Sequence, residues 1–188
     1  MGSEADFIND LLNPKKREKA FSKLLDNYQE RLYWHIRKIV VTHENADDVL
    51  QNTFLRIYKS LPNFKQKSSL HTWMYRIAYN ESIRFLDIQK RKQYNSLDEE
   101  DNYYLNKLAE DIYFDGNEAQ LKLNQVINEL PEKQKRVFQL KYFDDLKFRE
   151  ISEILELKES TLKSLYYSSV KYIENNVVKI QPLLKKEV

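Results

Sequence analysis

This chain contains very few residues that favour turns. Two glycines, Gly2 and Gly116, and four prolines occur among its 188 residues. Hairpins and glycine-rich phosphate loops need glycine at their turns, so this scarcity leaves little room for either. Apolar side chains recur instead at spacings of three and four residues, which is the period of an amphipathic helix. The sequence therefore predicts an all-α protein.

Several classes of function are disfavoured by what the sequence lacks. Cysteine is absent, which excludes disulfides and thiolate-held metal sites. No segment approaches the roughly 18 apolar residues needed to span a bilayer, so we expect a cytoplasmic protein with no membrane insertion. His35, His43 and His71 lack the spacing of a metal site, and no nucleophile has a base and an orienting group. We expect no enzyme, no metal and no cofactor.

Charge is distributed unevenly, although the net charge is only +2. Residues 1–92 carry a net charge of +6, residues 93–122 carry −6, and residues 123–188 carry +2. A run of four carboxylates at 98–101 would repel itself in a compact element. The pattern predicts three parts, namely a helical domain at 1–93, an acidic linker at 94–117 and a second helical domain at 118–188.

The first domain is predicted to contain three helices. An apolar stripe marks one helix at about 29–41. Asn45 is expected to cap the second helix, which Pro62 ends, and Ser69 is expected to cap the third. We give Met1–Ser3 no weight, because such a start is typical of a cloning scar.

The second domain carries the spacing of a helix-turn-helix. Pro131 is expected to open one helix, and the motif itself would follow at 148–155 and from Glu159 to about Val177. Ser152 is small enough to permit close approach of the two helices. Glu156 stands where glycine is common, at a cost of about 1 kcal/mol. From these residues alone, a DNA-reading unit and an ordinary antiparallel helix pair remain open alternatives.

Two sequence blocks resemble regions 2 and 4 of the extracytoplasmic-function (ECF, group IV) sigma factors of the sigma-70 family. The first comprises ADDVLQNTF at 46–54, Phe64 and TWMYRIAYN at 72–80. The second comprises LPEKQKRVF at 130–138, REI at 149–151 and STLKS at 160–164. The resemblance covers about residues 18–175. It implies a sigma factor that binds core RNA polymerase, through the beta and beta-prime subunits, and directs initiation at promoter DNA.

The resemblance also implies a polymerase-docking face on an acidic helix. Polar side chains recur there at helical spacing, able to pair with basic groups of a partner. The alternative interpretation is that Asp47 and Asp48 form a solvated first turn, stabilised by the helix dipole. The expected core polymerase-binding residues are Asp47, Asp48, Gln51, Asn52 and Leu55.

A loop and the helix after it correspond to the part of the family that captures the minus-ten element as single-stranded DNA. Lysines there can neutralise phosphate, polar side chains can bond an extruded base, and aromatic rings can stack on it. Phe64 is expected to form a wall of the base pocket, whereas Trp73 fits a core position better than a stacking one. The expected residues are Phe64, Lys65, Gln66, Lys67, Ser68, Ser69, Trp73, Arg76, Asn80 and Arg84.

The helix-turn-helix corresponds to the part that reads the minus-thirty-five duplex. Arginines that usually follow the Lys-Ser pair in the family are replaced here by Leu165, Tyr166 and Tyr167. Fewer cations should weaken binding and flatten its salt dependence. The expected residues are Arg149, Lys158, Glu159, Ser160, Thr161, Lys163, Ser164, Tyr167 and Lys171.

Two other functions stay open alongside the sigma factor. One is a free-standing helix-turn-helix regulator, and the other is a sigma-like interaction module that acts as a mimic or decoy. By family analogy, an anti-sigma factor is an expected partner, and the acidic linker threads the polymerase cleft. A soluble tether would have the same linker composition.

Overall fold

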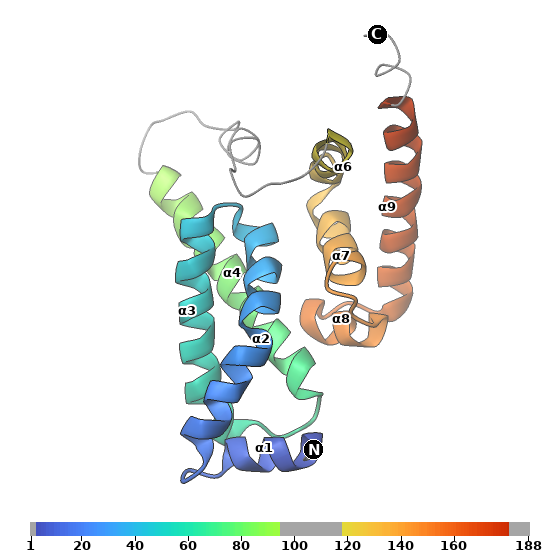
Figure 1. The fold of residues 1–188 in the computed structure, drawn as a ribbon. Helices are drawn as coiled ribbons and strands as arrows, with labels where there is room; N and C mark the ends of the chain where they lie inside the picture. Colours follow the sequence, from blue (N-terminus) through green and yellow to red (C-terminus); the bar gives the residue numbers. More distant parts are fainter. Residues whose placement is uncertain (1–2, 95–117, 181–188) are drawn as a thin grey trace. The chain divides into compact units, whose positions relative to one another are not determined.

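The computed structural model describes residues 3–94 and 118–180, and the chain divides into two compact units. The described residues form helices and connecting segments with no β-strand, which confirms the predicted all-α class. The elements of the first unit are α1 (Glu4–Leu12), α2 (Arg17–Val40), α3 (His43–Ser60), the short 3-10 helix η1 (Leu61–Asn63) and α4 (Leu70–Tyr94). Those of the second are α6 (Glu118–Asn128), α7 (Glu132–Tyr142), α8 (Phe148–Leu155) and α9 (Glu159–Ile180) (Figure 1).

The first unit is a bundle in which α2, α3 and α4 pack against one another (Figure 1). Apolar residues spaced three and four apart place Leu32 and Ile36 of α2, Ile57 of α3 and Met74 of α4 in its interior. Burial of each such side chain contributes about 1.5–3 kcal/mol. The polar faces of α3 and α4 lie outside this interior and are exposed to solvent.

A helix that the sequence interpretation missed precedes this bundle. Ser3 caps α1, because its hydroxyl accepts a hydrogen bond from the Asp6 backbone N–H while the Asp6 side chain accepts one from the Ser3 backbone N–H. Ser3, to which the sequence interpretation gave no weight, is thus the N-cap of α1. Another correction extends the first predicted helix, since α2 begins at Arg17 rather than near residue 29.

The start of α3 also differs from the prediction. Thr42 is the N-cap, and its hydroxyl accepts a hydrogen bond of 3.2 Å from the Asn45 backbone N–H. Asn45 is therefore the third helical residue, and Glu44 is the acidic residue of the first turn. Ser69 does cap α4 as predicted, with its hydroxyl accepting from the Thr72 backbone N–H at 3.1 Å.

The second unit is held by α6, α7, α8 and α9 around a small apolar core. Val126, Ile127, Leu130, Phe138 and Ile173 form its buried cluster. Pro131 is the N-cap of α7 and lies one position before the helix that it was expected to open. The helix-turn-helix has the predicted bounds for α8 and the predicted start for α9.

The predicted acidic linker at 94–117 lies outside the described residues, apart from Tyr94, which ends α4. Within the described part of the chain, no helix has the length and apolar character needed to cross a membrane.

Candidate functional site

The five expected polymerase-binding residues share one exposed face of α3. Their spacing of three and four residues places them on neighbouring turns, and Leu55 is 52% exposed. Because α3 begins at His43, Asp47 and Asp48 lie beyond its first turn, where the helix dipole has little effect. Stabilisation of the helix dipole therefore does not explain why carboxylates occur at these two positions. Both are exposed and available to a partner. The residues of this face are Asp47, Asp48, Gln51, Asn52 and Leu55.

A groove between α2 and α3 adjoins this face. Leu25 and Gln29 of α2 line one side, while Leu50 and Phe54 of α3 supply apolar lining next to the carboxylates. Leu25 and Gln29 were not among the predicted site residues. Their positions on the α2 helix, near the acidic row, follow from packing between helices and leave no local signature in the sequence.

Residues 64–69 form an irregular loop between η1 and α4, here called the 64–69 loop. Phe64 is only 7% exposed, and its ring centroid lies 4.7 Å from that of Trp73 at an interplanar angle of 36°. Its backbone N–H also donates to the Leu61 carbonyl oxygen at 3.0 Å. Phe64 therefore anchors the loop in the core, and its place in a base pocket stays a prediction.

The polar residues of the 64–69 loop face solvent. Lys65, Gln66 and Lys67 are exposed, and Ser68 is half-buried. Gln66 adopts φ of 53°, a left-handed conformation that costs a residue with a side chain about 1 kcal/mol. Residues in such strained conformations persist only where the surrounding structure holds them, and they are frequent at binding sites. The loop is thus a cationic, conformationally restricted segment.

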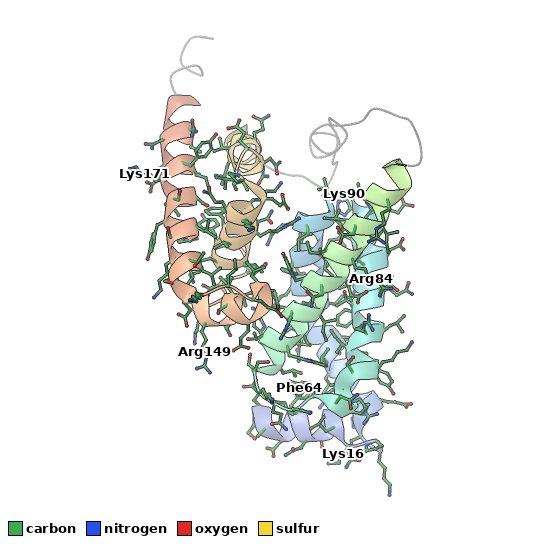
Figure 2. The ribbon with its side chains drawn as sticks, turned by 180° about the vertical axis from the view of Figure 1, so that it is seen from behind. Lys16, Phe64, Arg84, Lys90, Arg149 and Lys171 are labelled. Carbon is green, nitrogen blue, oxygen red and sulfur yellow. The ribbon has the colours of Figure 1, made fainter. Side chains whose placement is uncertain are left out.

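Exposed polar side chains continue from the loop along α4. Arg76, Asn80 and Arg84 repeat every four residues and are all exposed, and Figure 2 labels Arg84 on this helix. A shallow groove on α4 includes Asn80, Arg84 and, two turns further, Arg91. Arg91 was absent from the predicted site, although its distance of seven residues from Arg84 is two helical turns.

In the second unit, every residue of the predicted reading surface is exposed. Among the aromatic residues described there, Tyr167 is the most accessible, with 63% of its surface exposed. Its neighbour Tyr166 is instead half-buried between Phe138 and Phe148, with ring centroids 6.0 and 5.8 Å away. Burial raises the pKa of the Tyr166 phenol. The exposed residues are Arg149, Lys158, Glu159, Ser160, Thr161, Lys163, Ser164, Tyr167 and Lys171.

Charges on the helix-turn-helix balance one another. Residues 148–171 contain four Lys and Arg and four Glu, which gives a net charge of zero. Arg149 lies 4.0 Å from Glu153, and the Lys163 ammonium lies 5.9 Å from the centre of the Phe148 ring. Long-range attraction of this surface to phosphate is therefore weak, and hydroxyl and aromatic groups dominate it.

Known protein families match both units. The family described as Sigma-70 region 2 matches residues 24–92, which cover most of the first unit. The family described as Sigma-70, region 4 matches residues 120–172, which include most of α6, all of α7 and α8, and α9 as far as Tyr172. The region 2 match precedes the region 4 match along the chain, in the same order as the two sequence blocks that resemble these regions.

Similar proteins extend over nearly the whole chain. An ECF RNA polymerase sigma-E factor of Haemophilus influenzae is 30% identical over 175 residues, which cover 89% of this chain and 90% of that protein. The one of Escherichia coli K12 is 28% identical and covers 92% of each chain.

Two solved structures share the fold. One is the sigma factor RpoE in complex with the anti-sigma factor NepR from Bartonella quintana, at 18% identity and a TM-score of 0.65, covering 90% of this chain and 99% of that one. The other is CnrH in complex with the cytosolic domain of CnrY, at 14% identity and a TM-score of 0.62, covering 98% and 96%.

Proposed function

Because this chain belongs to the extracytoplasmic-function family of RNA polymerase sigma factors, we propose that it binds core RNA polymerase and directs transcription initiation at specific promoters. In this role it is a specificity subunit that works in the cytoplasm with the polymerase and supplies no catalytic group. Residues 1–93 would bind polymerase and open the promoter, and residues 118–188 would contact the upstream duplex.

The observation that carries this proposal is the separation of two charged surfaces within the first unit. The exposed face of α3 presents Asp47 and Asp48, which suit a basic partner surface. The 64–69 loop presents Lys65 and Lys67, which suit phosphate. One bundle thus has separate surfaces for a protein and for a nucleic acid, as a factor that links polymerase to a promoter requires.

The 64–69 loop has the chemistry to hold unpaired DNA. Extruding a base costs a few kcal/mol, and stacking returns about 1–3 kcal/mol per base. Gln66 and Ser68 can form hydrogen bonds with base edges. The half-buried ring of Trp73 lies in the first turn of α4, directly after the loop. Arg76, Asn80 and Arg84 extend the contact along the melted strand.

An anti-sigma factor is the third proposed partner, after polymerase and promoter DNA. The two solved relatives were determined with protein partners, namely the anti-sigma factor NepR and the cytosolic domain of CnrY. An inhibitor of that kind would hold this chain inactive by covering surfaces that polymerase needs.

Transcription with purified bacterial core polymerase tests the proposal. We expect the full chain to yield discrete transcripts from genomic templates, and mapping of their start sites should reveal shared upstream sequences. Absence of promoter-dependent transcripts on every template would contradict the proposal. Tight specific binding of duplex DNA without polymerase would favour a free-standing regulator instead.

A charge reversal on α3 tests the docking face separately. Asp47→Lys together with Asp48→Lys should remove co-purification with core polymerase, because like charges then oppose a basic surface. Glu18→Lys together with Glu174→Lys changes the same number of exposed charges on other helices and should leave co-purification intact. Equal binding by both double variants would show that docking uses another surface.

A further inference from the structure

Helix α1 lies outside the matched family regions and yet is firmly docked. The region 2 match begins at residue 24, whereas α1 spans Glu4–Leu12. Leu11 is 0% exposed, and Phe7 and Ile8 are half-buried. A helix of nine residues is marginal in water by itself, so these tertiary contacts are what hold α1 in place.

Both ends of α1 are closed by side chains. Ser3 and Asp6 form the capping box at its start. At its end, the Arg17 guanidinium donates from Nε to the Leu11 carbonyl oxygen and from Nη2 to the Leu12 carbonyl oxygen, each at 3.1 Å. These bonds satisfy carbonyls that a helix end leaves without an internal partner. Arg17 begins α2, so α1 is joined directly to the bundle.

Several contacts place α1 beside the 64–69 loop. It contacts η1, the element from which the loop departs, and Figure 2 shows Phe64 next to α1. In α2, burial raises the pKa of the Tyr28 phenol, the Arg31 guanidinium lowers it, and the Glu4 carboxylate of α1 adds a further upward effect. The Tyr28 ring lies 5.9 Å from that of His71, in the first turn of α4. The contact with η1 therefore places α1 at the anchor from which the loop departs.

We propose that α1 is a brace that positions the 64–69 loop for an unpaired DNA strand. This inference rests on the proposed function, in which the loop captures the minus-ten element. The loop has no regular secondary structure and contains a left-handed Gln66. Fixing η1 beneath it reduces the ordering that must accompany DNA binding. Leu11 is a positioning residue in this scheme and touches no DNA.

Truncation of Leu11 tests the brace in holoenzyme formed from the full chain. The probe is a promoter fragment taken from start-site mapping, with 2-aminopurine in its minus-ten element to report opening. Truncation of a fully buried leucine should lower the equilibrium constant for docking of α1 on the bundle by roughly a hundredfold. Leu11→Ala should therefore slow promoter opening about tenfold, because a smaller fraction of the molecules holds the 64–69 loop in its DNA-binding conformation. It should also accelerate hydrogen exchange at residues 61–69 while polymerase binding stays unchanged.

The control is Leu32→Ala, which removes the same atoms from a wholly buried site in the middle of α2. It should lower stability without slowing opening or loosening residues 61–69, and Leu11→Met should restore the wild-type rate. If Leu11→Ala unfolds the unit, Arg17→Ala carries the test, because it releases the end of α1 without making a cavity. A wild-type rate with a released α1 would overturn the brace. A wild-type protein that opens no mapped promoter would overturn the proposed function instead.

Discussion

The Ser152 hydroxyl donates a hydrogen bond of 2.6 Å to the carbonyl oxygen of Leu157. This bond joins α8 to the turn before α9 and satisfies the carbonyl of Leu157, which belongs to neither helix. Ser152 therefore does more than permit close approach of the helices, because it also fixes the turn that orients the reading helix.

Removal of this hydroxyl should destabilise the second unit. Ser152→Ala is expected to lower its free energy of unfolding by about 1 kcal/mol, since the Leu157 carbonyl loses its donor in a partly buried turn. Urea denaturation followed by circular dichroism would measure the change. Ser168→Ala, at an exposed position of α9, is the matched control and should be nearly neutral. Equal effects of the two changes would show that the turn does not depend on Ser152.

Glycine at position 156 should have the opposite effect. Glu156 adopts φ of 55°, and the left-handed penalty of about 1–2 kcal/mol exceeds the entropy cost of glycine, about 0.5–1 kcal/mol. We expect Glu156→Gly to raise the free energy of unfolding by about 0.5 kcal/mol. Lys158→Gly, two residues later and outside the left-handed region, should lower it. A loss of stability in both variants would mean that the Glu156 side chain has contacts worth more than the strain.

Charge reversal in the 64–69 loop should separate promoter opening from polymerase binding. Lys65→Glu together with Lys67→Glu places carboxylates where the proposal puts phosphates, so opening should be lost while co-purification with polymerase persists. Permanganate reactivity of unpaired thymines would measure opening. Lys19→Glu together with Lys23→Glu, at exposed positions of α2, should leave opening intact. Loss of both activities in the loop variant would contradict the division of surfaces.

Duplex recognition by the second unit should depend only weakly on salt. Each phosphate contact adds about 0.9 to the slope of log affinity against log salt concentration, and residues 148–171 contain only four cations. Lys163→Ala should reduce this slope by about one. Tyr167→Ala should weaken promoter binding by about tenfold and leave the slope unchanged, as expected for a base contact.

Filter binding of the holoenzyme over a series of salt concentrations would measure both effects. Lys133→Ala, at an exposed position of α7, is the control cation and should change neither affinity nor slope. An unchanged affinity in Tyr167→Ala would remove this residue from the reading surface.

The capping box of α1 should make this helix sensitive to acid. Hydrogen bonds from the Ser3 hydroxyl and backbone N–H hold the pKa of the Asp6 carboxyl below its ordinary value of 3.8. Because the folded-state pKa is depressed, the capping box stabilises α1 above that value, and its contribution is lost as the pH falls through the lowered pKa. Ser3→Ala should return the Asp6 pKa toward 3.8 in a carboxyl NMR titration. Ser22→Ala should leave it unchanged, and an Asp6 pKa insensitive to Ser3 would contradict the capping box.

Local features of the sequence were enough to predict much of the fold and the family. The bounds of α8, the start of α9, the Ser69 cap and the left-handed turn at Glu156 all agree with the structure. Each depends on a few adjacent residues, through apolar spacing, capping or the sterics of one backbone position. The family was recognisable because its motifs are also short and local.

Tertiary packing decided what those patterns left open. Phe64 became an anchor because Trp73, nine positions away, covers its ring, and α1 exists as a docked helix because η1 and Arg17 hold it. Contacts between separate elements determine these outcomes. A run of neighbouring residues does not specify which distant surface it will pack against.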